Sequence, residues 1–534
     1  MKSWQLIAGV SLCALSLCAC SGAEGDNSAP LAYEGDEPGE CTDGADNDQD
    51  QAFDCDDPGC AGSPLCTGAE SRQRDNEALD TDSEPEAEDA SESRASEDVE
   101  SADIEAPEDG SVDAGPTPEE EPEDMSSEPV DPQNPCPPLT SPSGTLIELS
   151  PSDATELQAS LDSAEEYTTF VLNEGIYPLG DDGLTISVPN TSLRSKSGQA
   201  DAVILEGSQE SEVGITIKAP GVSVAELTIQ HISGDAIHIE PDPSHSALTN
   251  IKLYGLNIID ALERAIHVEG TNQTYADGGM IACSTISLSE EGREALTDEC
   301  DIGGIDLRQA AYWTIRDNHV KDLWCKKASA QPTAILAWRS SAYTLIERNR
   351  IDDCTRGIGL GEAQSPLAGE RTYSDEGCDL DVHVDHYRGV VRNNMLFVGG
   401  EAFMEANPSY ESGIHLWSCC QGNVVHNTVV GMKAPYSSIE WRREGSTGIQ
   451  ILNNLVSHNL RERTGAQAMS LGNLEDADET IFINIEEGDL HLDPLTLGAL
   501  NAAEDLQVGL ADHDFEGDPR LGARDIGADE VLEE

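Results

Sequence analysis

The chain has few positive charges. Its 534 residues include 29 lysines and arginines against 103 aspartates and glutamates, which gives a formal net charge of −74 at pH 7. A protein with this balance cannot bind nucleic acid by displacing counterions from the phosphate backbone, so that class of partner is excluded. It also repels acidic polysaccharide, unless a cation lies between the two.

The N-terminal apolar run is too short to span a membrane. Lys2 precedes it and it extends from Leu6 to Leu17, which is the pattern of an export signal over residues 1–20. The residues Leu17-Cys18-Ala19-Cys20 that end it resemble the lipobox of bacterial lipoproteins. This resemblance implies lipidation at Cys20 and a lipid-anchored protein at the outer membrane or cell surface. An ordinary cleaved signal peptide is the alternative.

Large apolar residues are nearly missing from residues 67–135, which consist mainly of Glu, Asp, Ser, Pro and Ala. A segment of this composition cannot bury enough surface to fold, and its charges repel one another and extend it. We predict a disordered acidic linker here and a shorter linker at residues 21–40. The longer one serves as a stalk that holds the C-terminal part of the chain away from a membrane.

Residues 41–66 form a small module rich in cysteine and aspartate. Its alternating aspartates offer hard oxygen ligands and resemble the calcium repeats of thrombospondin type 3, although Gln49 and Gln51 stand where that family usually has glycine. The predicted Ca²⁺ ligands are Asp46, Asp48, Asp50 and Asp54. The alternative is an acidic knot without metal, which the four cysteines of the module hold by two disulfides.

From residue 136 onward, one pattern recurs about every thirty residues. Ile315-x-x-Asn318-x-Val320 leads to Ala334-Ile335-Leu336-Ala337, and Ile346-x-x-Asn349-x-Ile351 leads to Gly357-Ile358-Gly359-Leu360. Similar runs on both sides bring the count to eight. Each copy is too short and too rich in β-forming residues to bury its own apolar face, so the copies must stack on one another.

No stretch between these runs shows the 3.6-residue apolar period of a crossover helix, which argues against a βαβ fold. Coils that rise by one strand spacing form a parallel β-helix, and its recurring asparagines can hydrogen-bond to one another along a ladder. The pattern resembles the right-handed parallel β-helix of the pectate-lyase superfamily.

We therefore predict an all-β fold with a right-handed parallel β-helix of eight or more coils over residues 136–488. A helix that begins near Ser152, with Leu157 and Leu161 on one face, resembles the helix that caps the N-terminal end in that superfamily. Residues 489–534 resemble its C-terminal closing tail.

The cysteines of this region suggest two disulfides. Cys325 and Cys354 occupy the same place in successive coils, so we predict that they pair across the stack. Cys283 and Cys300 flank an insertion and form the second predicted pair. Four cysteines stay unassigned: Cys136, Cys378, Cys419 and Cys420.

One outward row of side chains carries most of the candidate chemistry. Strand alternation places His267 beside Asp306, and His415 beside Glu440, at the ~4.8 Å spacing of neighbouring strands. These four are the predicted acid–base groups. The next outward row holds predicted substrate-binding groups, with arginines for carboxylates and tryptophans for sugar rings. They are Arg308, Trp338, Trp417 and Arg442.

In the resembling lyases the substrate lies along one outward sheet, often with Ca²⁺, but their catalytic motifs are missing here. The chain has no Arg-x-Pro-x-x-Arg of pectate lyases, and it lacks the polygalacturonase set of Asn-Thr-Asp, Gly-His-Gly and Arg-x-Lys taken together. We predict an exported, monomeric protein that binds a polysaccharide, with cleavage by elimination or hydrolysis left open. The alternative is a non-catalytic adhesion or structural protein, whose histidines and tryptophans pack under the insertions.

Overall fold

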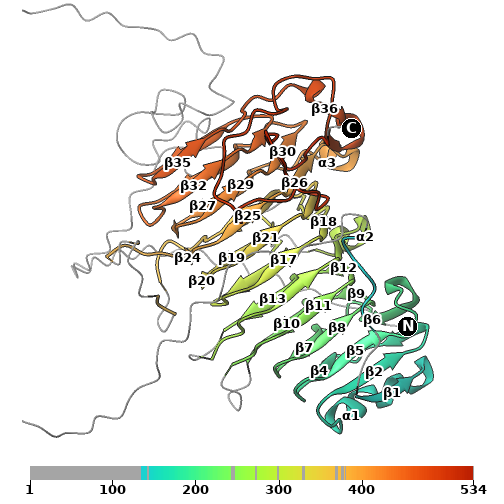
Figure 1. Cartoon of the computed structure of the whole chain (residues 1–534). Coiled ribbons are helices and arrows are strands. Elements are labelled where there is room, and N and C mark those ends of the chain that lie inside the picture. The colour runs from blue at the N-terminus through green and yellow to red at the C-terminus, as the bar shows by residue number, and fades with distance from the viewer. Residues whose placement is uncertain are drawn as a thin grey trace, which may run out of the picture. The chain divides into compact units, whose positions relative to one another are not determined.

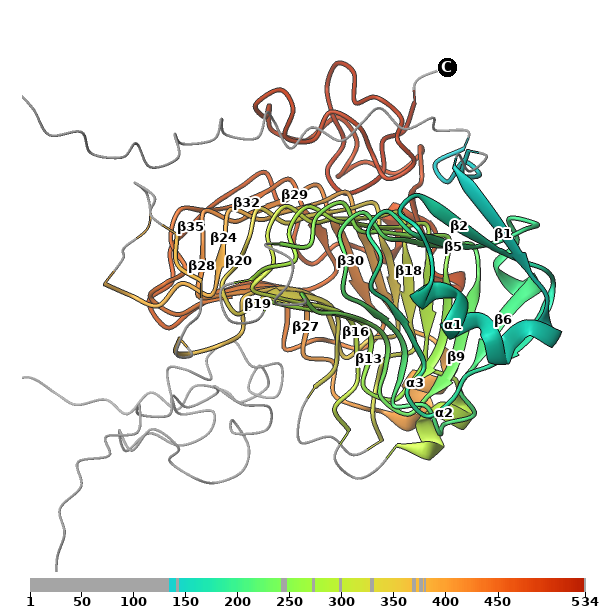
Figure 2. The ribbon, with the colours of Figure 1, turned by 90° about the horizontal axis from the view of Figure 1, so that it is seen from below.

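The computed structural model describes residues 134–140, 144–241, 247–270, 274–296, 300–326, 331–366, 371–373, 378 and 381–532. Figure 1 and Figure 2 show that strands dominate this part of the chain and stack in parallel. The lipobox, both linkers before residue 134 and the module at residues 41–66 lie outside the described residues. In the described ranges, no helix has the length and apolar character needed to cross a membrane.

Three long sheets form the sides of the fold. Sheet A has 12 strands, in this order: β1 (Thr145–Leu149), β2 (Thr168–Leu172), β5 (Ser192–Ser195), β8 (Ser223–Ala225), β11 (Lys252–Tyr254), β14 (Met280–Ala282), β17 (Thr314–Arg316), β21 (Leu345–Glu347), β25 (Val390–Arg392), β29 (Asn423–Val425), β32 (Ile449–Leu452) and β35 (Ala468–Leu471).

Sheets B and C have 10 strands each. Sheet B contains β3 (Gly175–Pro178), β6 (Val203–Glu206), β9 (Thr228–Ile232), β12 (Asn257–Ala261), β15 (Thr285–Ser287), β18 (His319–Lys321), β22 (Arg350–Asp352), β26 (Met395–Val398), β30 (Thr428–Gly431) and β33 (Leu455–Val456). Sheet C contains β4 (Leu184–Ile186), β7 (Val213–Ile217), β10 (Asp235–Ile239), β13 (Arg264–Glu269), β16 (Gly303–Arg308), β19 (Thr333–Trp338), β23 (Arg356–Leu360), β27 (Ser412–Trp417), β31 (Ser437–Arg442) and β34 (Leu460–Arg463).

The remaining elements are short. Two small sheets contain β20 (Ser341–Ala342), β24 (His386–Tyr387) and β28 (Cys419–Cys420), and the antiparallel pair β36 (Phe482–Asn484) and β37 (Asp489–Leu492). The helices are η4 (Pro151–Glu156), α1 (Leu157–Asp162), η5 (Ala200–Ala202), α2 (Glu290–Ala295), α3 (Glu401–Ala406), η6 (Glu479–Ile481) and η7 (Ile485–Glu487).

Each coil takes one strand from sheet A, one from sheet B and one from sheet C, as in β8, β9 and β10, before the chain returns to sheet A. The 10 strands in sheets B and C correspond to ten such coils. The fold is a right-handed parallel β-helix, as predicted. Helix α1 lies at its N-terminal end and buries Leu157 and Leu161 against the first coils, which confirms the predicted capping helix.

The recurring Ile-x-x-Asn-x-Val run consists of two strands with a corner between them. Ile315 belongs to β17 in sheet A and Val320 to β18 in sheet B. Asp317, just before the asparagine, has a left-handed backbone with φ 55°, and Arg348 has φ 52° at the same place in the next coil. This conformation turns the chain, so the asparagine falls inside the corner.

The asparagines form the predicted ladder. In each step the side-chain amide of one asparagine donates to the side-chain oxygen of the next at 2.9–3.0 Å. The same oxygen also accepts the backbone N–H of the preceding asparagine. The ladder consists of Asn318, Asn349, Asn394, Asn427, Asn454 and Asn473.

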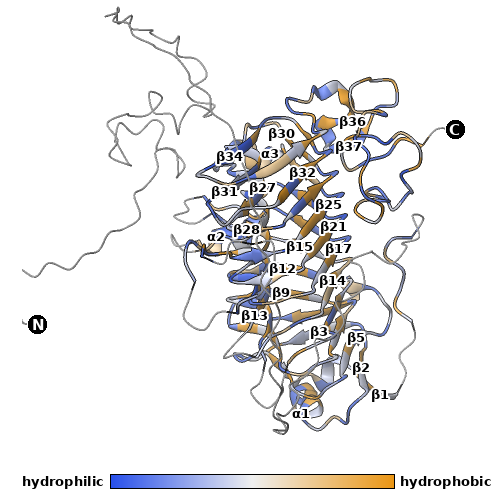
Figure 3. Cartoon of the chain, turned by 60° about the vertical axis from the view of Figure 1, so that its left-hand side comes forward, coloured by the Kyte–Doolittle hydropathy of each residue, from blue (hydrophilic) through white to orange (hydrophobic). Residues whose placement is uncertain are grey.

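The core fills the interior of the coils. Its side chains are the inward residues of sheets A, B and C, such as Ile281, Ile286 and Ile305 of one coil. In Figure 3 the apolar colour is strong on β17, β21 and β25, and polar colour dominates the turns at their ends. After β35, the tail packs outside sheet B, where Ile526 and Ala528 join a separate core with outward side chains of β26 and β30.

The disulfides differ from the predicted pairs. The structure joins Cys136 to Cys283, Cys300 to Cys325, and Cys378 to Cys420. The pairings Cys325–Cys354 and Cys283–Cys300 are therefore wrong. Cys354 and Cys419 are buried free thiols in the described part of the chain. Cys283 follows β14 on the outer side of sheet A, where the segment that begins at residue 134 passes, and Pro135 O lies 3.9 Å from its Sγ.

Candidate functional site

Sheet C places the predicted outward residues side by side. His267 lies opposite Asp306, and Arg308 opposite Trp338. Further along the same sheet, the pairing of β27 with β31 places two more predicted pairs in register, His415 with Glu440 and Trp417 with Arg442. The first group, around His267 and Arg308, and the second group, around His415 and Trp417, have different surroundings. This difference decides which of them can contact a ligand.

The second group is covered. The exposed fractions of His415, Glu440, Trp417 and Arg442 are 0, 1, 3 and 4%. The prediction that they line an open groove is wrong. His415 fills the space above Gly359, where an added Cβ would lie 2.3 Å from its Nε2 atom.

Side chains from neighbouring strands and from the segment after β23 form this cover. Arg356 binds the carboxylates of Glu411 and Glu362, and its guanidinium lies 4.9 Å from the centre of the Trp417 ring. Arg443 donates a hydrogen bond of 2.5 Å to the carbonyl oxygen of Glu362. This layer separates the predicted acid–base pair from any polymeric substrate.

The covered pair is a structural network. Glu440 accepts hydrogen bonds from Trp417 Nε1 at 2.5 Å, Ser437 Oγ at 2.7 Å and Arg463 at 3.4 Å. Burial acts to raise the pKa of Glu440, but Arg463 and Arg442 outweigh it and lower this pKa. Burial lowers the pKa of His415 well below its ordinary value, and the nearby arginines act in the same direction. An ionised Glu440 thus compensates the positive charge of the surrounding arginines, while His415 stays neutral.

Two residues of the first group, His267 and Arg308, line an open cleft. A cleft of about 660 Å³ lies over β7, β10, β13 and β16, and the side chains of His238, Arg264, His267 and Arg308 are on its wall. Trp338 follows Arg308 in the same outward row.

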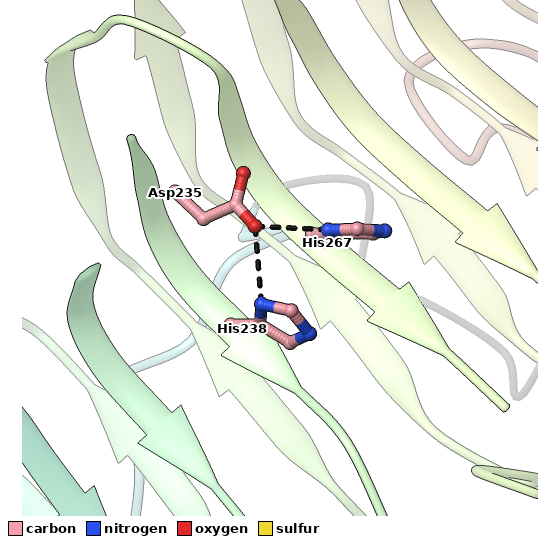
Figure 4. A group of neighbouring side chains, drawn as sticks. All are labelled: Asp235, His238 and His267. Carbon is pink, nitrogen blue, oxygen red and sulfur yellow. Dashed lines mark hydrogen bonds and ion pairs between the residues drawn. The ribbon is translucent and has the colours of Figure 1, made fainter. Parts of the chain in front are cut away.

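At the centre of this cleft, one carboxylate holds two imidazole rings. Asp235 Oδ2 lies 2.8 Å from His267 Nδ1 and 3.1 Å from His238 Nδ1, and Figure 4 shows both rings turned toward this single oxygen. The two ring centres are 4.7 Å apart. The Nε2 atoms of both rings are buried, and neither has a hydrogen-bond partner among the described residues.

The electrostatics of this group favour an ionised carboxylate. Burial acts to raise the pKa of Asp235, but the hydrogen bonds from His238 and His267 outweigh it and lower this pKa. Burial acts to lower the pKa of His238, and the Asp235 carboxylate reverses the effect and raises it. Asp235 therefore fixes the orientation of both rings, as a carboxylate does for histidine in acid–base and metal sites.

Asp306 positions its neighbours. Its carboxylate accepts hydrogen bonds from Arg264 at 3.2 Å, Arg308 at 2.9 Å and Trp338 Nε1 at 2.7 Å. Burial acts to raise the pKa of Asp306, but Arg308 and other cations lower it. A carboxylate with this many donors is a poor proton acceptor, so it orients Arg308 and Trp338 instead of transferring protons.

Asp235 is not among the site residues predicted from the sequence. In this coil an aspartate at the start of the strand stands three residues before the outward histidine. The same offset joins Ser412 Oγ to His415 Nδ1 at 3.2 Å, and Ser437 Oγ to the Glu440 carboxylate at 2.7 Å. A polar residue at the strand start, three before the outward position, is thus the signal that would have found Asp235.

The donor set of the cleft does not fit calcium, the ion implied by the resembling lyases. Ca²⁺ takes six to eight oxygen ligands. Here Asp235 is engaged by two imidazoles, and Asp306 by two arginines and a tryptophan. We derive no role for calcium in this cleft. The predicted calcium ligands, Asp46, Asp48, Asp50 and Asp54, lie outside the described residues.

Comparison with known proteins yields matches in structure only. No family model matches the chain, and no curated protein matches it in sequence. The pectate lyase Pel9A aligns with a TM-score of 0.45 and 8% identity, over 74% of this chain and 98% of that one. An alginate lyase from Paenibacillus sp. str. FPU-7 aligns at 0.39 and 12%, over 62% and 100%. A polygalacturonase from Erwinia carotovora ssp. carotovora aligns at 0.38 and 11%, over 66% and 99%. At these values no residue's role transfers to this chain.

Proposed function

We propose that the protein binds a polysaccharide in the cleft of sheet C. The observation that supports this proposal is the group of Asp235, His238 and His267 at an open cleft. The two histidines stand in the outward row next to the row that holds Arg308 and Trp338. An extended polymer can follow this row because successive coils repeat the same strand direction. The row supplies an aromatic ring, a guanidinium and imidazoles, which suit the faces and hydroxyl groups of sugars.

The Trp338 ring is held for such a contact. Its Nε1 donates to Asp306 at 2.7 Å, and the Arg308 and Arg339 guanidinium groups lie 5.2 and 4.4 Å from its centre. Bonds at one edge of the ring fix its orientation. A pre-oriented aromatic ring loses little conformational entropy when a sugar stacks on it.

We expect Trp338→Ala to weaken polysaccharide binding about tenfold or more, because the stacking area is lost. Trp338→Phe keeps a ring without the bond to Asp306 and should show a smaller loss. Tyr167→Ala removes an aromatic ring that is 62% exposed and lies next to β2, at the N-terminal end of the fold, and it should leave the affinity unchanged. A glycan array identifies the ligand, and titration of purified variants measures the affinities.

Equal affinities for the wild type and Trp338→Ala would contradict this placement of the ligand. Cleavage by elimination or hydrolysis is the finer part of the proposal, with His267 as the proton-transfer group. Assays of each array hit for new reducing ends and for unsaturated products that absorb in the ultraviolet decide it. Binding without either product identifies an adhesion protein.

We also propose that the protein is exported and anchored to a membrane by lipid on Cys20. The basis is the sequence Leu17-Cys18-Ala19-Cys20 alone. With Cys20→Ser, we expect the protein to leave the membrane fraction of the producing cells, because a mature chain without the acylated cysteine has no lipid. Cell fractionation and immunoblotting measure this, with Cys13→Ser as the matched control. Unchanged membrane association would contradict the anchor.

A further inference from the structure

We propose that Asp235, His238 and His267 bind a divalent first-row transition cation, for which Zn²⁺ is the test ion. One carboxylate oxygen and one ring nitrogen from each histidine lie within 4.8 Å of one another. The three residues come from neighbouring strands, β10 and β13, so the sheet itself fixes their spacing. The site lies in the cleft assigned to polysaccharide, and only its link to that ligand rests on the proposed function.

The distances are close to those of a metal centre. Ligands bound at about 2.0 Å in a tetrahedral zinc site lie about 3.3 Å from one another. In the structure Asp235 Oδ2 is 2.8 Å from one Nδ1 atom and 3.1 Å from the other. An ion between these atoms requires both Oδ2–Nδ1 distances to increase by a few tenths of an ångström, and His238 and His267 both line the open cleft.

The proton balance also favours an ion. In the hydrogen-bonded form each Nδ1 atom carries a proton, and both buried Nε2 atoms are without a partner among the described residues. A cation bound to the Nδ1 atoms moves the proton of each neutral imidazole to Nε2. The Nε2 atom of His267 lies 3.8 Å from Glu269 Oε2, so this carboxylate can accept the new N–H after a small movement. Carboxylates in this outer position are the usual partners of metal-bound histidines.

The chemical type of the donors selects the class of cation. Two imidazole nitrogens and one carboxylate oxygen suit zinc and its first-row neighbours, whereas calcium and magnesium need more oxygen atoms. The nearest arginines do not oppose a cation strongly because both are paired. Arg308 lies 2.9 Å from Asp306, and Arg264 lies 3.2 Å from Asp306 and 3.0 Å from Asp301.

A second cluster of the same residue types provides a contrast. His491, Glu516 and Asp529 also lie close enough to hold an ion. There, however, His491 Nδ1 is 2.5 Å from Asp489 and Nε2 is 2.7 Å from Glu516, so both ring nitrogens already have partners. That cluster is satisfied without an ion and connects parts of the C-terminal tail to one another. Beside Asp235, neither Nε2 atom has a hydrogen-bond partner in the described part of the chain.

A bound ion would give the cleft a property that the chain otherwise lacks. The protein has a formal net charge of −74, so a sugar carboxylate meets repulsion on approach. Three protein ligands leave at least one position on the ion open toward the cleft. A carboxylate of an acidic polysaccharide is the ligand that fits this position. The ion would thus act as the bridge between two polyanions.

The test uses the full chain, stripped with a chelator and dialysed. Calorimetric titration with Zn²⁺ should show one site that Ca²⁺ does not fill, and Co²⁺ should give visible absorption bands at the same stoichiometry. We expect His238→Gln, His267→Gln and Asp235→Asn each to weaken this site by about 100-fold or more. His319→Gln is the matched control because His319 also lies 2.8 Å from an aspartate, Asp352, in sheet B. It should leave the Zn²⁺ affinity unchanged.

Thermal unfolding provides a second readout that does not depend on the heat of binding. Zn²⁺ should raise the unfolding temperature of the wild type and of His319→Gln, but not that of His238→Gln. The inference is overturned if the wild type shows no Zn²⁺ site, or if His238→Gln and His267→Gln bind as tightly as the wild type. Circular dichroism of each variant shows whether it is folded. If His238→Gln is unfolded, His267→Gln replaces it in this test.

Polysaccharide titrations with and without Zn²⁺ separate this inference from the proposed function. Zn²⁺ binding without any polysaccharide binding would contradict the proposed function and leave the metal site in place. If the metal-free protein binds polysaccharide but shows no Zn²⁺ site, the metal site is contradicted and the proposed function is kept. If both hold, affinity for an acidic polysaccharide should rise at least tenfold on addition of Zn²⁺, and His238→Gln should abolish the increase.

Discussion

Replacing Asn394 by leucine is expected to lower the free energy of unfolding by about 3–5 kcal/mol. The Asn394 amide donates to Asn427 Oδ1 at 2.9 Å and to the carbonyl oxygens of Ile346 and Arg392 at 3.0 and 2.9 Å. Its oxygen accepts the backbone and side-chain N–H groups of Asn349 at 2.9 and 3.0 Å. Leucine has the same branching but no polar atoms, so most of the loss comes from polar groups left buried without partners, and the larger methyl groups add crowding.

The measurement is urea unfolding followed by circular dichroism, together with amide hydrogen exchange. Because coils contact mainly their neighbours, exchange should increase first around β21, β25 and β29. Asn423→Leu is the matched control, since among the described residues its side-chain amide donates a single bond, 3.5 Å long, and it lies on the outer side of β29. It should change stability by less than about 1 kcal/mol. Equal effects of the two substitutions would show that the ladder contributes little.

Replacing Glu440 by glutamine is expected to destabilise the protein by about 3 kcal/mol and to leave polysaccharide affinity unchanged. Glutamine has the same shape but no negative charge, so Arg463 and Arg442 lose their buried anion. The side chain also presents an amide where Glu440 accepts bonds from Trp417 and Ser437. The exposed Glu479 provides the matched control, because Glu479→Gln removes one negative charge at the surface and changes no buried ion pair.

The dependence on pH has a definite sign. The pKa of Glu440 is lowered in the folded protein, so its contribution is fully present above the unfolded value of about 4.3. It is lost as pH falls through the folded pKa. Unfolding curves of the wild type and Glu440→Gln should therefore differ most near pH 7 and converge in strong acid. Loss of turnover without loss of stability would instead restore a catalytic role to this residue.

The sequence could predict which residues are neighbours because strand period and coil period are both regular. The alternation of Ile305, Asp306 and Leu307 fixes which side chain points outward, and the repeat fixes that His267 stands beside it. The asparagine ladder follows from the same regularity. These features depend only on short runs whose geometry each coil repeats.

The sequence could not predict how deep these residues lie. Depth depends on insertions, whose paths no periodicity describes. Glu362 and Arg443 cover His415 and Glu440, yet they belong to loops of different coils. The cysteine pairings failed for the same reason. Cys136 precedes the coils, and only the folded path of its segment brings it to Cys283.

That disulfide determines how a pull on the chain would travel. Cys136 and Cys283 are bonded across a sequence separation of 147 residues. Tension applied from the N-terminal side therefore passes through sulfur directly into the fifth coil, just after β14. The four coils before it, which carry Asp235, His238 and His267, are excluded from the load path. If the bond were reduced, the same tension would enter at β1 and peel these coils away one at a time from the cap.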